Sequence, residues 1–203
     1  MIPAHQILKN KTILMEPDMS SAFAMAAAGA LAGHTEITNF VDPSLQPDHV
    51  FVEILKTMNI PVNIHGTSLV VEKADEIKHI ELNLAGAPDL FPILSILCAF
   101  AKGDSKLLGA PQLVHKESNR IKKTAELLSL AGVSLQEKPD GIMIFGQGPQ
   151  LKPRAFTFDP DQDHRMAMAA GLLKLKGFDI EIKQPDVVNK SFREFWICLG
   201  IKP

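Results

Sequence analysis

Four predicted loop-to-helix junctions carry charged side chains that a purely structural helix would not require. In the segment 161–175, Asp163 stands at the N-cap position before a run rich in Met, Ala and Leu, which are good helix formers. Arg165 lies in the first turn, where a cation opposes the helix dipole by roughly 0.3–1 kcal/mol. Beside the free backbone N–H groups of that turn, Arg165 would form a strong anion site. The alternative is a surface arginine paired with Asp161 or Asp163.

Two further junctions place a carboxylate beside a predicted helix start. Asp89 precedes a strongly apolar stretch, either as an N-cap or as a carboxylate at the lip of a cleft, able to accept a proton. Glu117 lies between Lys116 and Arg120, and Ser118 is expected to cap the helix that follows. This segment is either a solvated first turn or an acid/base glutamate flanked by two anion-binding cations.

The fourth junction offers one cation. Lys190 precedes Ser191, which is expected to cap the last helix, and in isolation Lys190 would be a surface lysine. The seven histidines show no metal-ligand spacing such as His-Glu-x-x-His. The segment 146–148 is a lone glycine pair after a strand, unlike a dinucleotide-binding loop. Neither a metal nor another cofactor is therefore expected.

A repeated order of elements positions these junctions. The apolar pattern predicts strand, helix, strand, helix, strand, strand, in repeats at about 11–73, 79–146 and 154–203 of one globe. The third repeat stops after its second helix. Its last two strands must therefore come from another segment, or the unit is left with open sheet edges. The predicted fold class is α/β, with β-α-β-α-β-β units of which the third is incomplete.

Glycines mark the predicted helix ends. Gly33, Gly103 and Gly177 are expected to end equivalent helices in the three repeats. A first strand is expected at 12–16, and a hairpin turn at 139–141. The predicted helices cover 22–31, 48–58, 90–100, 118–130, the run from 166 to 175, and 192–199.

Composition limits the class of protein. Of 203 residues, 46% are hydrophobic and 22% charged, as in ordinary soluble globular proteins. A net charge of -2 argues against a general nucleic-acid or anionic-membrane surface. The longest apolar stretch, 90–101, is too short to span a bilayer, and no secretory signal is visible. Cys98 and Cys198 are expected to be buried free thiols, which together predicts a cytosolic protein.

Taken together, the motifs resemble one family, 5-enolpyruvylshikimate-3-phosphate synthase, also called 3-phosphoshikimate 1-carboxyvinyltransferase. The segment 163–168, Asp-His-Arg-Met-Ala-Met, is similar to the hallmark of that family. The segment 116–120, Lys-Glu-Ser-Asn-Arg, is similar to its Lys-Glu-[Ser/Thr]-Asp-Arg. The remaining matches are Glu-Pro-Asp-Met-Ser-Ser-Ala at 16–22, Pro-Asp at 88–89 and Asn-Lys-Ser-Phe at 189–192. The resemblance covers nearly the whole chain, in the order of the family.

This resemblance implies an architecture. Family members have two globes, each built from three β-α-β-α-β-β units in an inside-out α/β barrel arrangement. The chain corresponds to the C-terminal globe, whose last strands come from the N-terminus of the protein in the family. Its implied partner is therefore the missing N-terminal half, in the same or a separate chain.

The resemblance also implies a reaction and residue roles. The family transfers the enolpyruvyl group of phosphoenolpyruvate to the 5-hydroxyl of shikimate-3-phosphate, releases phosphate and needs no metal. Arg120, Arg165 and Lys190 would hold phosphoenolpyruvate, since arginine suits bidentate carboxylate and phosphate contacts. Asp89 would contact the substrate and take the attacking hydroxyl proton, and Glu117 would pass a proton to and from the methylene carbon. The shikimate phosphate would be contacted by Lys116 and by Gln112, which stands where the family usually has Asn.

The substrate site of the family draws on residues of both globes. The other globe of the family supplies further cations and a Ser-Ser-Gln segment that are absent from this sequence. The isolated chain is therefore expected to be inactive and to bind phosphoenolpyruvate weakly.

Two alternatives to this hypothesis are considered. The first alternative is a non-catalytic anion-binding or regulatory domain that kept the fold. The second is a relative of RNA terminal phosphate cyclase, which the acidic balance and the motifs disfavour.

Overall fold

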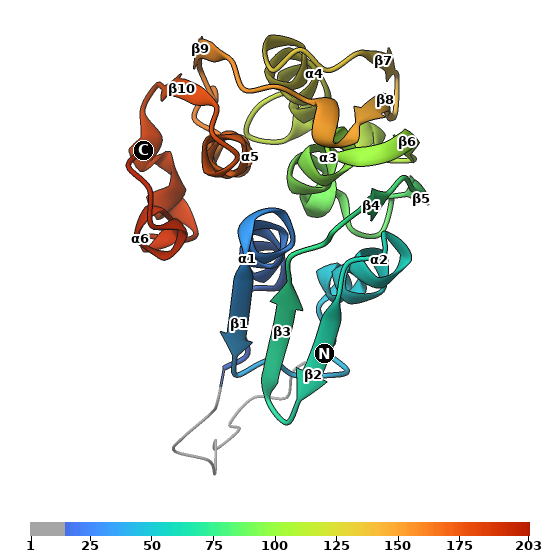
Figure 1. Ribbon diagram of the computed structural model, residues 1–203, viewed down its shortest axis with the longest axis vertical. Helices are drawn as coiled ribbons and strands as arrows, with labels where there is room; N and C mark the ends of the chain where they lie inside the picture. Colours follow the sequence, from blue (N-terminus) through green and yellow to red (C-terminus); the bar gives the residue numbers. More distant parts are fainter. Residues whose placement is uncertain (1–14) are drawn as a thin grey trace, which may run out of the picture.

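Three helices lie at the centre of the computed structural model, which describes residues 15–203. They are α1 (Met19–Ala32), α3 (Phe91–Ala99) and α5 (His164–Leu175). Each packs against the other two, and the strands lie outside them (Figure 1). Most residues of the three helices are buried. Their sequences are accordingly apolar on all sides, with no single apolar stripe.

The first repeat forms a three-stranded antiparallel sheet in the order β1-β3-β2. Residues 12–14 of the first predicted strand lie outside the described residues, and Met15 and Glu16 are not in a strand. Gly33 ends α1 as predicted. The other elements are β1 (His34–Thr38), the 3-10 helix η1 (Pro47–Val50), α2 (Phe51–Thr57), β2 (Val62–His65) and β3 (Ser68–Glu72).

The second repeat is the most complete. Strand β5 (Glu81–Asn83) and the short β4 (Ile77–Lys78) run parallel to β6 (Ala101–Leu108). Strand β8 (Gly141–Gln147) pairs antiparallel with β6 on one side and with β7 (Leu135–Lys138) on the other. The helical elements are η2 (Pro88–Leu90), α3, η3 (Pro111–His115) and α4 (Arg120–Leu130).

Two predicted boundaries in this repeat were wrong. Gly103 does not end a helix: α3 ends at Ala99, and after the C-cap Phe100 the chain passes directly into β6, where Gly103 has a φ of 99°. A side chain at Gly103 would collide with His79, since an added Cβ would lie 2.7 Å from its Nδ1. Ser118 does not cap α4, because the Asn119 side chain accepts the hydrogen bond from the backbone N–H of Lys122.

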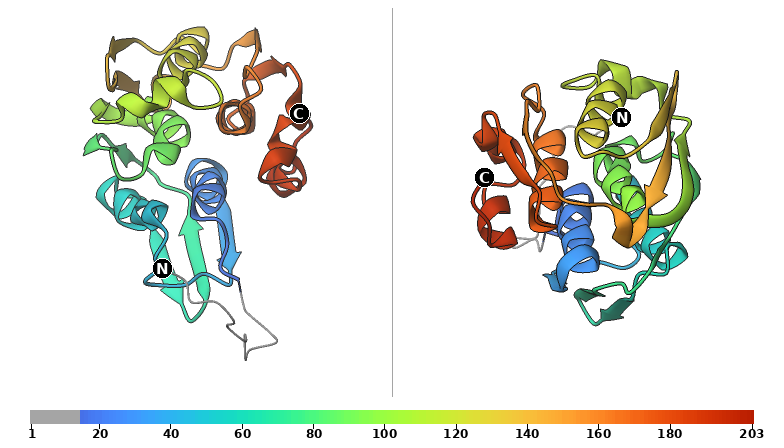
Figure 2. Two further views of the ribbon diagram at one scale, coloured as in Figure 1. Left: turned by 180° about the vertical axis from the view of Figure 1, so that it is seen from behind. Right: turned by 45° about the horizontal axis from the view of Figure 1, so that its top comes forward.

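The third repeat begins like the second and then stops. After η4 (Gly148–Gln150), strand β9 (Ala155–Phe158) pairs in parallel with β10 (Asp179–Ile182), as β5 pairs with β6. The chain closes with η5 (Pro185–Lys190) and α6 (Phe195–Leu199). Within residues 15–203, β10 has no counterpart of the β8-β7 hairpin. Figure 2 shows β9 and β10 at the side of the molecule that carries the C-terminus.

Two smaller predictions in this region were also wrong. Ser191 follows η5, and α6 starts only after Glu194, so Ser191 does not cap it. Cys98 is buried as expected, but Cys198 is exposed. In the part of the chain that the structure describes, no helix is long and apolar enough to cross a membrane.

Candidate active site

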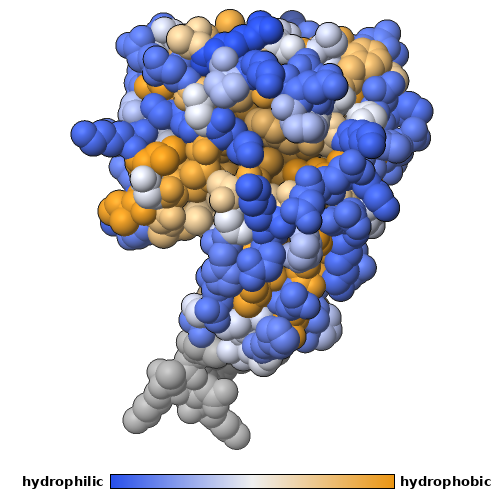
Figure 3. Space-filling view, viewed as in Figure 1, coloured by the Kyte–Doolittle hydropathy of each residue, from blue (hydrophilic) through white to orange (hydrophobic). Residues whose placement is uncertain are grey.

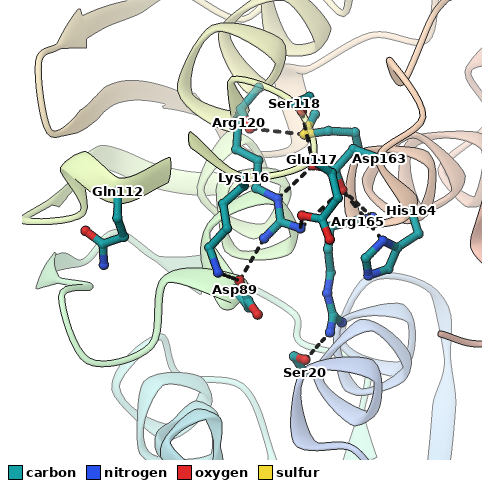
Figure 4. A network of polar contacts seen from close by, with 12 residues as sticks. Ser20, Asp89, Gln112, Lys116, Glu117, Ser118, Arg120, Asp163, His164 and Arg165 are labelled. Carbon is teal, nitrogen blue, oxygen red and sulfur yellow. Dashed lines mark hydrogen bonds and ion pairs between the residues drawn. The ribbon is translucent and has the colours of Figure 1, made fainter. Parts of the chain in front are cut away.

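The beginnings of α1, α4 and α5 and the turn η2 meet at one cluster of charged side chains. The N-cap residues Asp18 and Asp163 begin α1 and α5, and each accepts a backbone N–H from its own first turn. Asp89 lies in η2 just before α3, and Arg120 is the first residue of α4. Figure 4 shows Asp89, Arg120 and Asp163 converging from different helical segments. The repeat therefore places three core helix N-termini beside one another, a favourable environment for an anion.

Arg120 is at the centre of the cluster and is only 1% exposed. Its Nε donates to Asp163 Oδ2 at 2.8 Å, Nη1 to Asp89 Oδ1 at 2.8 Å, and Nη2 to Glu117 Oε2 at 2.9 Å. Burial opposes its charge, but the hydrogen bond that Arg120 donates to Asp163 and the negative charges of the three carboxylates raise the pKa of Arg120. The guanidinium, at the start of α4, thus contacts the starts of two other helical segments. Its partners Asp89 and Asp163 lie 31 and 43 residues away from Arg120 in the sequence.

The two predicted catalytic carboxylates are each paired with a lysine. Asp89 Oδ1 lies 2.9 Å from Lys116 Nζ, and Glu117 Oε1 lies 2.6 Å from Lys190 Nζ. Burial raises the pKa of Asp89, but the Lys116 hydrogen bond and Arg120 outweigh it, so the net shift is downward. The hydrogen bond from Lys190 lowers the pKa of Glu117 to about 2. Both carboxylates are therefore ionised at neutral pH in this arrangement.

Arg165 is buried and only partly paired. It is 5% exposed, and its Nη2 donates to the Ser20 hydroxyl and, at 3.4 Å, to Asp18 Oδ2. Its Nε and Nη1 are buried with no hydrogen-bond partner among residues 15–203. Buried donors of this kind normally have partners. The alternative of a surface arginine paired with Asp161 or Asp163 is wrong, because Arg165 is buried and its ion pair is with Asp18, while Asp163 pairs with Arg120.

The structure does not bring every predicted residue together. Gln112 lies apart from the cluster, and its side chain donates to the Ala85 carbonyl at 3.3 Å (Figure 4). His164 was not predicted; it is 5% exposed, and burial together with Arg165 lowers its pKa, so it is neutral at neutral pH. Asp48 was also missed, although Asp89, Arg165 and Asp18 all face it. Its sequence context, a Pro-Asp at a helix start, resembles an ordinary cap and gave no signal.

Two hollows open beside the cluster. Glu117 and Lys190 line a polar hollow of about 750 Å³, together with Gln162 before α5 and residues at the start of η5. Asp48 and Asp89 line a smaller one of about 280 Å³. In residues 15–203, no three His, Cys, Asp or Glu side chains are arranged to hold a metal ion. The arrangement suits anionic ligands and proton transfer at carboxylates.

Comparison with known proteins places this geometry in context. The model of the EPSP synthase (3-phosphoshikimate 1-carboxyvinyltransferase) family matches residues 1–199. A 3-phosphoshikimate 1-carboxyvinyltransferase of Pyrococcus abyssi is 38% identical over 98% of this chain and 47% of its own length. One of Syntrophobacter fumaroxidans is 37% identical over 96% of this chain and 46% of its own length. The chain thus spans about half the length of the curated relatives it matches.

Solved structures agree with the fold. EPSP synthase from Acinetobacter baumannii superposes with a TM-score of 0.72 at 27% identity, covering 90% of this chain and 44% of that chain. The enolpyruvyl transferase NikO from Streptomyces tendae superposes with a TM-score of 0.71 at 15% identity, covering 92% and 43%, which supports the fold alone. The predicted fold class is confirmed. By the family match over residues 1–199, the chain belongs to the EPSP synthase family.

Proposed function

We propose that this chain is the C-terminal half of an enzyme that transfers the enolpyruvyl group of phosphoenolpyruvate to the 5-hydroxyl of shikimate-3-phosphate, releasing phosphate. The observation that carries the proposal is the buried Arg165 beside the Arg120 cluster, two of whose donors have no partner among residues 15–203. The family membership supplies the reaction, since the relatives are named 3-phosphoshikimate 1-carboxyvinyltransferase. An enzyme of this biosynthetic step would act in the cytoplasm.

The proposed phosphoenolpyruvate site uses three cations. Arg165 offers its Nε and Nη1, which lie on opposite edges of the planar guanidinium, as separate donors to the oxygens of an anionic substrate. Arg120 and Lys190 are already engaged with carboxylates of this chain. A substrate anion must therefore compete with these carboxylates for the two cations. The isolated chain would therefore bind phosphoenolpyruvate weakly.

The proposed proton transfers follow from the ion pairs. Asp89 is ionised, so it is in the correct state to accept the proton of the attacking hydroxyl, while Lys116 beside it contacts the shikimate phosphate substrate. Gln112 would join Lys116 only after leaving the Ala85 carbonyl. Glu117, with a pKa of about 2, is a poor acid while Lys190 holds it. When a substrate anion draws Lys190 away, the pKa of Glu117 rises and it becomes able to hold a proton for the methylene carbon.

The proposed partner is the other half of the enzyme. Strand β10 stands where β6 stands in the second repeat, and β6 pairs with β8. The side chain of Ile197 in α6 is 81% exposed, and Figure 3 shows a large apolar area on the side where α5 and α6 lie. A hairpin supplied by the other half would extend the sheet from β10 and cover this area. Without that half the chain would be inactive.

The test is reconstitution. The chain is mixed with a polypeptide covering the N-terminal half of a relative, and phosphate release is measured with both substrates. Release by the mixture, but not by either part, supports the proposal. The matched control is Asp89→Asn, which should associate equally well and release no phosphate. Association without turnover in the wild-type mixture would favour a non-catalytic anion-binding domain.

A further inference from the structure

Gln46 joins two distant parts of the first repeat. It lies in the loop before η1, and its backbone N–H donates to Ser44 Oγ at 3.0 Å. Its side-chain Oε1 accepts the backbone N–H of Met19 at 2.9 Å, and its Nε2 donates to the Pro17 carbonyl at 3.0 Å. The Met19 N–H belongs to the first turn of α1 and has no partner within its own helix. The Gln46 side-chain amide thus uses both its acceptor and its donor to bind the turn that begins α1.

The turn held by Gln46 is the one that holds Arg165. Asp18 and Ser20 flank Met19 in sequence, and both contact Nη2 of Arg165. Asp18 is itself fixed by accepting the backbone N–H of Ser21 at 3.0 Å. A shift of the Pro17–Met19 backbone would therefore move both partners of Arg165 together.

Arg165 needs such support because nothing else among residues 15–203 hydrogen-bonds its guanidinium. Within the described part of the chain Nε and Nη1 lack partners, so the hydrogen bonds that direct the planar group all come from Nη2. Hydrogen bonds from Nε and Nη1 to an anion are directional, so the planar group must be aligned with the oxygens of the ligand. A displacement of about 1 Å in a positioning group can cost two orders of magnitude in rate.

We propose that Gln46 is a positioning residue for Arg165, which it orients toward the anionic substrate by clamping the Pro17–Ser20 turn. The proposal rests on the proposed function, in which Arg165 binds phosphoenolpyruvate. The role calls for an amide, because the turn presents one donor and one acceptor at the same place. A carboxylate could accept from Met19 but could not donate to Pro17, and it would add a charge close to Asp18.

The experiment observes Arg165 directly. Arginine Nε–H signals of the intact 203-residue chain are recorded by NMR, with the Arg165 signal assigned from its loss in Arg165→Lys. Phosphoenolpyruvate and inorganic phosphate are titrated separately. In the wild-type chain the Arg165 signal should move with each ligand. In Gln46→Ala and Gln46→Glu the half-saturating concentration should rise at least about fivefold, and the ligand-free Arg165 signal should shift.

Two controls separate positioning from stability. Gln136→Ala removes an exposed amide on β7 and should leave the titration unchanged. Ile144→Val trims a fully buried side chain far along β8, so it should lower the melting temperature but leave the half-saturating concentration unchanged. If Gln46→Ala does not fold, Gln46→Glu keeps the acceptor for Met19 and carries the test.

The outcomes are distinct. Equal half-saturation in the wild type and the Gln46 variants, with Arg165 responding in all of them, overturns the positioning role and leaves the proposed function intact. An Arg165 signal that ignores both ligands in the wild type overturns the anion-binding role and the positioning role together. A loss of affinity in Ile144→Val as large as in the Gln46 variants also overturns the proposal, because stability alone would then explain the effect.

Discussion

Arg120→Met tests whether the buried ion network stabilises the fold as the structure indicates. Methionine has similar length but no charge, so the substitution leaves Asp163, which is 0% exposed, without its charged partner. Among residues 15–203, the hydrogen bonds left to Asp163 would be those from the Ser118 hydroxyl at 3.1 Å and the backbone N–H of Arg165 at 2.9 Å. Breaking a buried ion pair on one side costs about 3–5 kcal/mol. That is a large part of a typical unfolding free energy of about 5–15 kcal/mol.

Urea unfolding followed by the fluorescence of Trp196 would measure the loss. The double variant Arg120→Met/Asp163→Asn should recover part of it, because the amide oxygen still accepts the Arg165 N–H while the buried charge is gone. Lys56→Met breaks a comparable but exposed ion pair and should cost less than about 1 kcal/mol. A loss below about 1 kcal/mol for Arg120→Met, or no recovery in the double variant, would refute the reasoning.

Three further outcomes are expected. Lys190→Met should raise the pKa of Glu117 from about 2 toward 4.5, as read from carboxyl NMR. Folding lowers the pKa of Glu117, so its ion pair stabilises the fold above about pH 4.5, and this stabilisation is lost as the pH falls toward 2. In Lys190→Met the melting temperature should therefore depend less on pH in this range. An unchanged pH profile would contradict this. Burial and Asp89 raise the pKa of Asp48, so its charged form opposes folding above that pKa. Asp48→Asn should therefore increase the melting temperature at pH 7, and a decrease would count against the argument. Burial raises the pKa of Cys98 to about 12, so alkylation of the native chain should modify Cys198 alone, and labelling of both thiols before denaturation would disprove it.

Local signals predicted the frame of the molecule well. Asp163 before an apolar run indicated the start of α5, and Gly33 indicated the end of α1, because caps depend on residues close in sequence. The order of elements followed from apolar periodicity for the same reason. The prediction that Gly103 ends a helix was wrong because a glycine after an apolar stretch is typical of a helix end. In the structure Gly103 lies within a strand, beside His79.

The hydrogen-bond partners of the site residues could not be predicted from the sequence, because they lie far away along the chain. Ser118 and Asn119 are adjacent, and both are residue types that cap helices. The sequence alone does not show which one caps α4, because the Ser118 hydroxyl instead donates to Asp163, 45 residues later in the chain. Gln46 gave no local signal either, since its partners in the α1 turn lie 27 and 29 residues away. Residue types at the helix starts thus indicated the kind of chemistry, while their pairing depends on how the repeats pack.

The pairing has a consequence for catalysis by the proposed enzyme. Lys116, Arg120 and Lys190 are each paired with a carboxylate of this chain, so its cluster is largely self-neutralised before any substrate arrives. A substrate anion that draws Lys190 away also releases Glu117, whose low pKa depends first on that hydrogen bond. Anion binding and the ability of Glu117 to hold a proton are then coupled through one lysine. Cations from the other half would favour this exchange, because they would attract the substrate without engaging the carboxylates of this one.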